Sequence, residues 1–193
     1  MNKGNLIMKK KKNFKILIAC EYSGIVRDAF AAKGYDAWSC DILPTESSGN
    51  HIQGNVLEHL DKGWDMMIAH PPCTYLSNAG IAWFNEKKYG EKARLRKKLR
   101  IEGMEFVKKF YYNDIPKVCI ENPVGYLNNN WKKPSQVIQP YYFGDTESKR
   151  TCLWLKNLKP LIHTKIVKPK IYGYYKSGKK KGMPIYKNDW QQW

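Results

Sequence analysis

Two short segments of the sequence carry residue types that could perform nucleophilic catalysis. Cys73 follows Pro71 and Pro72, and the two prolines stiffen the chain so that a loop presents the thiol from a fixed position. A thiolate is strongly nucleophilic and can add to an electron-poor carbon. Glu121, followed by Asn122 and a proline, could supply a general acid, because a carboxyl group with a raised pKa can donate a proton. A surface acid that caps the following turn is the alternative interpretation of Glu121.

A second set of residues suits a ligand that contains a nucleoside. Gly24 lies just after the first apolar run of the chain, and a glycine there lets the backbone approach a ligand closely. Asp41 ends the next apolar run, where an acid can accept hydrogen bonds from ribose hydroxyls. A turn glycine and a capping aspartate explain these two residues equally well.

The apolar pattern predicts the elements that must position these side chains. Apolar runs predict strands, and apolar residues at helical spacing predict helices, the first of them closed by Gly34. The expected strands are 14–19, 35–40, 64–69, 116–120, 137–143 and 151–155, and the expected helices are 25–32, one turn at 56–60, and 86–111.

Strands that alternate with helices predict an α/β fold with an open, mostly parallel sheet. Helices should cover both faces of that sheet, and the closing pair of strands should add an antiparallel edge. Ligands bind at the carboxyl ends of the strands in such sheets, so we expect the candidate residues to share one edge.

Composition narrows the class of partner. The chain has 193 residues and a formal net charge of +17, from 34 basic against 17 acidic side chains. Such an excess favours an anionic partner, most commonly nucleic acid, although a lysine-rich soluble surface is the ordinary alternative. No apolar stretch is long enough to span a membrane and no secretory signal is found, so the expected location is the cytoplasm.

Cysteine spacing argues against a metal site. None of the five cysteines forms a CxxC pair, so no bound metal is expected. Cysteines at or near the ends of apolar runs are most often small buried residues of the core. That interpretation applies to Cys20, Cys40, Cys119 and Cys152.

Taken together, these motifs resemble those of the DNA cytosine-5 methyltransferases. The resemblance rests on Ala69 to Cys73, on Glu121 to Pro123, on Ala19 to Gly24 and on Lys149 to Thr151, and it covers roughly residues 14–160. The chain is most similar to the short cytosine methylase-like proteins of phages and prophages. The resemblance implies a Rossmann-like class I fold and methyl transfer from S-adenosylmethionine to carbon 5 of cytosine in DNA. A phage-encoded protein would act in the cytoplasm of its host.

The resemblance also implies a role for each matching residue. Cys73 would form the covalent adduct at carbon 6, Glu121 and Asn122 would contact the base, and Arg150 would reach the cytosine O2. The implied cofactor-binding residues are Glu21, Tyr22, Ser23, Gly24, Asp41, Ile42, Asn55, Val56 and Pro72.

The chain departs from the family pattern in its recognition parts. The family's large target-recognition segment has no counterpart, so a partner chain or a homodimer could supply target recognition. We expect a flexible basic arm at 1–12, a catalytic domain at 13–163 and a basic, aromatic segment at 164–193. The basic helix around Arg94 to Arg100 and the last segment are candidates for holding nucleic acid; a disordered, solubilising tail is the alternative for that segment.

Two other functions remain open from the sequence. A chain without a recognition domain could methylate RNA, tRNA included, or a single strand. The reduced number of glycines in the cofactor loop would also suit a non-catalytic nucleic-acid-binding protein that has kept the fold.

Overall fold

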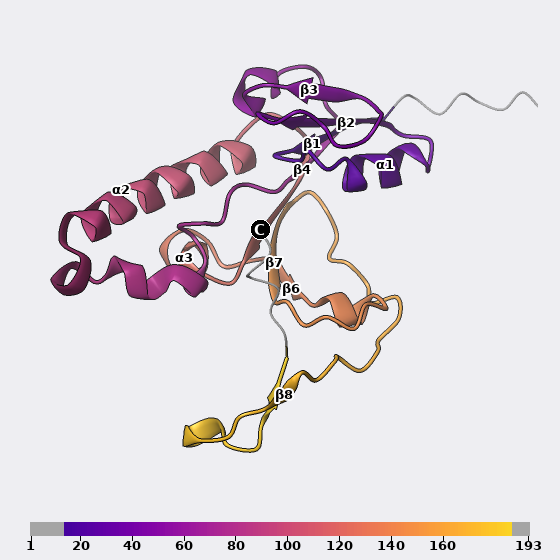
Figure 1. The fold of residues 1–193 in the computed structure, drawn as a ribbon. Helices are drawn as coiled ribbons and strands as arrows, with labels where there is room; N and C mark the ends of the chain where they lie inside the picture. Colours follow the sequence, from indigo (N-terminus) through magenta and orange to yellow (C-terminus); the bar gives the residue numbers. More distant parts are fainter. Residues whose placement is uncertain (1–13, 187–193) are drawn as a thin grey trace, which may run out of the picture. The chain divides into compact units, whose positions relative to one another are not determined.

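A computed structural model describes residues 14–186, so the basic arm expected at 1–12 lies outside the described part of the chain. Seven strands form one mixed, mostly parallel sheet in the order β3-β2-β1-β4-β5-β7-β6 (Figure 1). The strands are β1 (Lys15–Ala19), β2 (Asp36–Asp41), β3 (His51–Gln53), β4 (Met66–Ala69), β5 (Lys117–Pro123), β6 (Gln136–Ile138) and β7 (Thr151–Lys156).

The predicted α/β class and the antiparallel edge are both confirmed. β1 pairs with β2, and β2 with β3, in parallel. β7 pairs antiparallel with both β5 and β6, which makes the edge of the sheet antiparallel. No helix among the described residues has the length and apolar character that crossing a membrane requires.

The chain divides into two compact units. The first comprises Met1–Ile68 and Asp114–Lys117, and the second comprises Ala69–Asn113 and Val118–Trp193. The implied cofactor-binding residues other than Pro72 belong to the first unit. Pro72, Cys73, Glu121, Asn122 and Arg150 all belong to the second unit.

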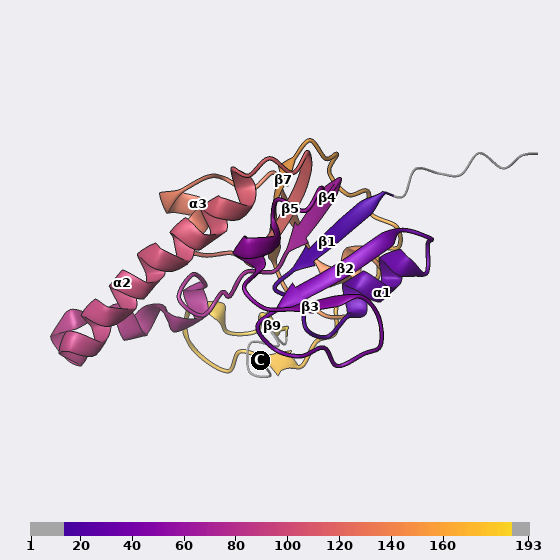
Figure 2. The same cartoon turned by 90° about the horizontal axis from the view of Figure 1, so that it is seen from above.

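The core of the first unit forms around β1. Ile16 and Ile18 are buried with Ala37 of β2, and Phe30 of helix α1 (Ile25–Ala31) packs against them. α1 lies against β1 and β2 in Figure 2. Gly34 follows the helix with φ 81°, a left-handed conformation that glycine adopts without strain, as the sequence predicts.

The second unit is built on helix α2 (Glu86–Tyr111), whose bounds are those predicted from the sequence. Met104, Val107 and Phe110 of its apolar stripe are buried, whereas Leu95 is exposed. Gly90 interrupts the helical backbone near the start with φ 48°. The remaining helical elements are α3 (Tyr126–Asn130) and the 3-10 helices η1 (Val56–His59), η2 (Asn78–Phe84), η3 (Pro140–Tyr142) and η4 (Gly178–Lys180).

Four local predictions differ from the structure. The sequence analysis missed the three-residue strand β3. β5 continues through Pro123 instead of ending at Ile120, because β7 supplies antiparallel partners as far as Thr151. The strand expected at 137–143 is only β6, because Pro140 lacks the N–H that a ladder needs and begins η3 instead. The described part of the last segment, 164–186, contains the antiparallel strands β8 (Gly173–Tyr174) and β9 (Pro184–Ile185), which differs from the alternative interpretation of a disordered tail.

Candidate active site

The loop after β4 presents Cys73 in a half-buried position. Pro71 is buried and Pro72 is exposed, and neither proline can donate a backbone hydrogen bond. The Cys73 carbonyl accepts hydrogen bonds from the backbone N–H groups of Leu76 and Ser77, both at 2.9 Å. The backbone therefore turns directly after the thiol, and we call residues 70–77 the Pro-Cys loop.

Asn122 connects β5 to this loop. Its side-chain amide, which is 1% exposed, donates a 2.9 Å hydrogen bond from Nδ2 to the Pro71 carbonyl. The Asn122 Oδ1 atom is also buried and has no hydrogen-bond partner among the described residues. Sequence reasoning named Asn122 as a residue that contacts a base, and the structure gives it a contact that positions the Pro-Cys loop.

Gly125 holds the other end of the Pro-Cys loop, and the sequence analysis did not identify it. Gly125 forms an isolated bridge with Ser77, and the next residue, Tyr126, donates its backbone N–H to the Leu76 carbonyl at 2.7 Å. A Cβ atom at Gly125 would lie 2.0 Å from the Leu76 oxygen, so only glycine allows this approach without a backbone shift. Ser77 and Gly125 are far apart in the sequence, so no local pattern indicates the contact.

Arg100 of α2 also supports the loop. Its Nε donates to the Tyr75 carbonyl at 2.8 Å, and its guanidinium carbon lies 3.2 Å from the centre of the Phe84 ring. Arg96 stacks over the Tyr75 and Phe84 rings. The sequence analysis named the basic helix around Arg94 to Arg100 as one candidate for holding nucleic acid, which stays a prediction. Arg96 and Arg100 of this stretch also pack against aromatic side chains of their own unit.

Glu121 lies on β5 opposite Leu153 of β7, and a quarter of its side chain is exposed. Its Oε2 lies 3.4 Å from Nδ1 of His70, the residue that opens the Pro-Cys loop. The other ring nitrogen of His70 is buried without a hydrogen-bond partner among the described residues. Sequence reasoning left the role of His70 open, and the structure pairs it with the candidate acid.

Burial, two neighbouring charges and a backbone hydrogen bond act on the pKa of Cys73, and the hydrogen bond lowers it. Burial raises the pKa of the Cys73 thiol, and the negative charge of Glu121 raises it further. The Lys149 ammonium lowers the pKa of Cys73. Lys149 is half-buried, whereas Arg150, the residue named from the sequence, is exposed and acts on the pKa of Cys152. The sequence analysis therefore missed Lys149 as the cation that acts on Cys73.

Lys149→Ala is expected to slow the alkylation of Cys73 by iodoacetamide about threefold at about pH 8, because the variant thiol ionises less. The rate should rise with pH in both proteins, since the reactive thiolate accumulates as the pH approaches a raised pKa. Alkylation is followed by peptide mass mapping at Cys73, with Arg150→Ala as the matched control. Equal rates in the Lys149 and Arg150 variants would contradict this account of the charge near Cys73.

Three of the other thiols have strongly raised pKa values, which disfavours their thiolate forms. Burial raises the pKa of Cys20 and of Cys119 to about 12 each, and the pKa of Cys40 to about 11. Cys40 and Cys152 are fully buried, as expected for core residues. Of the five cysteines, Cys73 alone lies on a loop stiffened by two prolines.

In the first unit, Glu21 caps helix α1. Its buried carboxylate accepts the backbone N–H groups of Val26 at 2.7 Å and Arg27 at 3.2 Å. Tyr22 and Ser23 follow in the turn, and the Ser23 hydroxyl accepts a long, 3.4 Å hydrogen bond from the Ile25 N–H. The proposed cofactor loop is therefore ordered by its own helix N-terminus.

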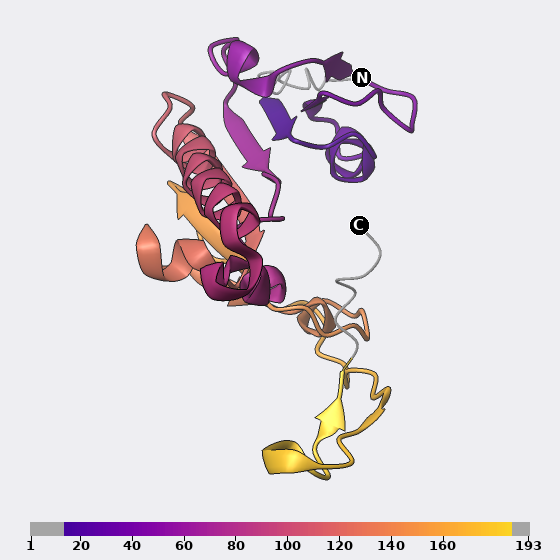
Figure 3. The same cartoon turned by 60° about the vertical axis from the view of Figure 1, so that its left-hand side comes forward.

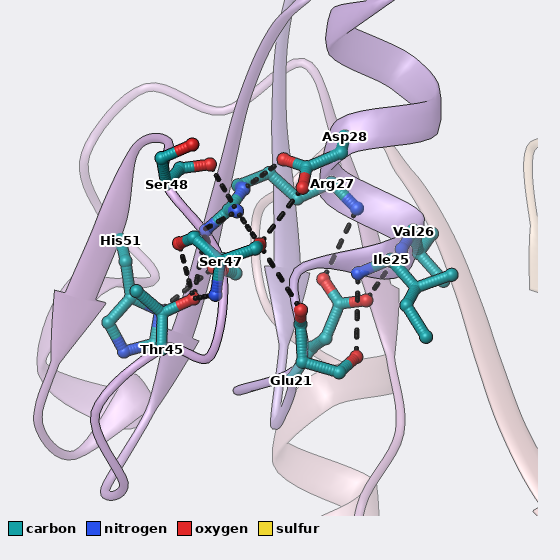
Figure 4. A network of polar contacts seen from close by, with 11 residues as sticks. Glu21, Ile25, Val26, Arg27, Asp28, Thr45, Ser47, Ser48 and His51 are labelled. Atoms are coloured by element: carbon teal, nitrogen blue, oxygen red, sulfur yellow. Dashed lines mark hydrogen bonds and ion pairs between the residues drawn. The ribbon is translucent and has the colours of Figure 1, made fainter.

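A fully buried arginine organises the same region. The guanidinium of Arg27 donates to Asp28 at 2.7 Å, to Ser39 at 3.1 Å and to Ser47 at 2.6 Å (Figure 4). The hydrogen bond from Arg27 lowers the pKa of Asp28. A Cβ atom at Gly24, where φ is 76°, would lie 2.2 Å from the Ser47 hydroxyl and 2.4 Å from an Arg27 nitrogen. Gly24 is therefore required by this internal network, apart from any ligand.

Arg27→Ala is expected to lower the free energy of unfolding by about 3 kcal/mol, because it leaves buried hydroxyl and carbonyl partners without a donor. Urea denaturation measures the loss. Arg94→Ala, at a site where the side chain is 63% exposed, should change stability by less than about 0.5 kcal/mol. Similar free energies of unfolding for the two variants would show that the hydrogen-bond network of Arg27 contributes little to stability.

The residues after β2 differ in their availability to a ligand. Asp41 accepts the Leu43 N–H at 3.0 Å through one carboxylate oxygen, and Ile42 is 74% exposed. Asn55 caps η1 by accepting the Leu57 N–H at 3.2 Å, and Val56 is buried. Asn55 and Ile42 are exposed and Asp41 is half-buried, so these three present surface to a ligand, whereas Val56 is buried.

Comparison with known proteins gives no assignment of this chain. No protein-family model matches the sequence, and the curated proteins contain no match. Among the described residues, no group of three or more His, Cys, Asp or Glu side chains is arranged to hold a metal ion.

Proposed function

We propose that the protein is a Rossmann-like, S-adenosylmethionine-dependent methyltransferase that methylates carbon 5 of cytosine in DNA. The observation that carries the proposal is the connection between the Pro-Cys loop and the Glu121–Asn122 pair. Asn122 holds the Pro71 carbonyl two residues before Cys73, and the charge of the adjacent Glu121 acts on the Cys73 thiol. A nucleophile and an acid are thus provided by two segments that contact each other.

The chemistry assigned to these side chains is an addition to the cytosine ring. The Cys73 thiolate forms a bond to carbon 6, and protonated Glu121 donates its proton to ring nitrogen 3. The ring then becomes an enamine whose carbon 5 is nucleophilic. After methylation at carbon 5, a water molecule takes the proton from that carbon, Cys73 leaves as a thiolate, and ring nitrogen 3 returns its proton to the Glu121 carboxylate, which restores the ring.

The elevated pKa of Cys73 has a role in this scheme. A thiol that stays protonated in the free protein resists adventitious oxidation and alkylation, since thiolate is the reactive form. Burial is the largest of the effects that raise the pKa of Cys73, the charge of Glu121 adds to it, and the ammonium of Lys149 opposes both. Lys149 is therefore a charge that favours the reactive thiolate.

The residues after β2 fit the cofactor. Asp41 has a carboxylate suited to ribose hydroxyls, and the exposed Ile42 offers an apolar contact for an adenine ring. S-Adenosylmethionine, when bound, would supply an electrophilic methyl group. Glu21 and Val56 contribute by ordering the surrounding backbone.

Methyl transfer to DNA, followed by nucleoside analysis, tests the proposal. The protein is incubated with isotopically labelled S-adenosylmethionine and cytosine-containing DNA, and the DNA is digested to nucleosides. We expect the label in 5-methyldeoxycytidine. Label only in RNA supplied in parallel would make the protein an RNA methyltransferase. A protein that binds nucleic acid but no S-adenosylmethionine would be a non-catalytic relative.

A further inference from the structure

The C-terminal arm, defined as residues 164–186, has the composition of a nucleic-acid-binding segment. It carries seven lysines and no acidic residue: Lys165, Lys168, Lys170, Lys176, Lys179, Lys180 and Lys181. Lysines neutralise phosphates and release their counterions, which gives affinity without base recognition. The density of positive charge thus exceeds that of the chain as a whole.

The arm is folded as a hairpin. Gly173 pairs with Ile185, and Tyr174 with Pro184, and the Tyr175 N–H donates to the Met183 carbonyl at 3.0 Å. Figure 3 shows the hairpin in yellow, with η4 between its strands. Lys179 and Lys180 lie in η4, so the tip carries the highest concentration of charge.

The hairpin presents aromatic surface to solvent. Tyr174 is 59% exposed and Tyr175 is 39% exposed, and the Lys180 ammonium lies 5.5 Å from the centre of the Tyr175 ring. Met183, the residue before β9, is also exposed. Two-residue strands without a buried face are marginally stable by themselves. A base that stacks on the exposed tyrosine rings would bury apolar area that now faces solvent.

The base of the arm lies beside the segment that leads to the candidate site. The Val167 N–H donates to the Tyr141 carbonyl at 2.9 Å, and the Lys170 N–H donates to the Thr146 carbonyl at 2.8 Å. The Tyr172 hydroxyl donates to Glu147 at 2.6 Å. Glu147 is two residues before Lys149, the cation that acts on Cys73. The arm is thus anchored to the segment between β6 and β7, which contains Lys149.

We propose that the C-terminal arm binds single-stranded DNA next to the target cytosine. The proposal rests on the proposed function and adds the strand state of the substrate. Exposed tyrosine faces stack on bases only where the bases are unpaired, whereas a duplex hides those faces. An unpaired cytosine also avoids the few kcal/mol that a methyltransferase spends to flip a base out of a duplex.

Binding to labelled oligonucleotides tests the proposal with the full chain carrying Cys73→Ala. Fluorescence anisotropy compares a single strand of DNA, the corresponding duplex and an RNA of the same sequence. We expect the single-stranded DNA to bind at least about tenfold more tightly than the duplex. Equal or tighter binding of the duplex would overturn the proposal, and tighter binding of the RNA would replace DNA as the partner.

Two sets of variants locate the binding surface. Tyr174→Ala with Tyr175→Ala should weaken single-strand binding at least about tenfold, while the two Phe variants retain it because they keep the ring faces. Lys179→Ala, Lys180→Ala and Lys181→Ala together should reduce the slope of log affinity against log salt by about 2. The matched control, Lys87→Ala with Lys88→Ala and Lys92→Ala on α2, removes the same charge.

The control also separates this proposal from the proposed function. If the α2 variant loses as much single-strand affinity as the arm variant, the arm is not the binding surface. Methylation of duplex DNA by the arm variants at the wild-type rate would overturn the arm proposal and leave the methyltransferase assignment intact. If single-strand binding depends on the arm but no DNA accepts a methyl group, the arm proposal stands and the methyltransferase assignment is wrong.

Discussion

Cys73→Ala is expected to reduce methyl transfer to cytosine by at least about 10⁴-fold, because without the thiol nothing adds at carbon 6. Carbon 5 then remains a poor nucleophile whatever the affinity for cofactor or DNA. The measurement is the initial rate of methyl incorporation into DNA, with cofactor affinity measured by calorimetry in the same preparation. The two proteins should bind S-adenosylmethionine equally well, since Cys73 is not among the residues assigned to cofactor binding.

Cys119→Ala is the matched control for this prediction. Cys119 is another partly buried cysteine of the second unit, and burial raises the pKa of its thiol to about 12. Its removal should leave the methylation rate within about twofold of wild type. If the Cys73 variant retains methylation, or if both variants lose it equally, the assignment of Cys73 as the nucleophile is wrong.

Glu121→Gln is expected to slow methyl transfer by about 10²- to 10⁴-fold, the usual contribution of a positioned general acid. Glutamine keeps the size of the side chain but cannot deliver a carboxylic proton. The same substitution removes the charge that raises the pKa of Cys73, so iodoacetamide should alkylate Cys73 faster in the variant. The two rates therefore move in opposite directions.

Burial is the largest effect that raises the pKa of Cys73, so a variant that merely loosened the Pro-Cys loop would also speed alkylation. The free energy of unfolding, measured by urea denaturation, separates the two cases: a loosened variant loses stability, whereas Glu121→Gln with the assigned role stays within about 1 kcal/mol of wild type. The control is Glu105→Gln, a carboxyl of the same unit that pairs with Lys108 on α2. Slower alkylation in the Glu121 variant, or unchanged methylation, would contradict the assignment of Glu121 as the acid.

The sequence predicts those features of the fold that depend on local pattern. Helix α2 begins and ends where its apolar spacing indicates, and β1 coincides with the first apolar run to within one residue. Helix α2 and strand β1 depend on contacts that are repeated along a single element. The composition and the period of the apolar residues are therefore sufficient to predict their bounds. The antiparallel edge follows from the short connection between the last two predicted strands.

Features that depend on contacts between distant segments could not be predicted. Burial of Arg27 requires a loop of serine and threonine side chains some twenty positions away to supply acceptors, and an arginine on a helix ordinarily indicates a solvated face. Gly125 matters because the Leu76 carbonyl approaches it, which no pattern near Gly125 encodes. Sequence similarity to a motif selected Arg150, whereas the backbone before β7 places the charge of Lys149 where it acts on Cys73.

Trapping on 5-fluorocytosine tests the central claim most directly. The protein is incubated with S-adenosylmethionine and an oligonucleotide, single-stranded or duplex, that contains 5-fluorocytosine, and the intact mass of the product is measured. Because fluorine prevents the final elimination, we predict a stable adduct equal to the sum of protein, oligonucleotide and one methyl group, mapped to Cys73 and absent from Cys73→Ala. A folded, cofactor-binding protein that forms no adduct with either DNA, or an adduct mapped to another residue, would contradict the account.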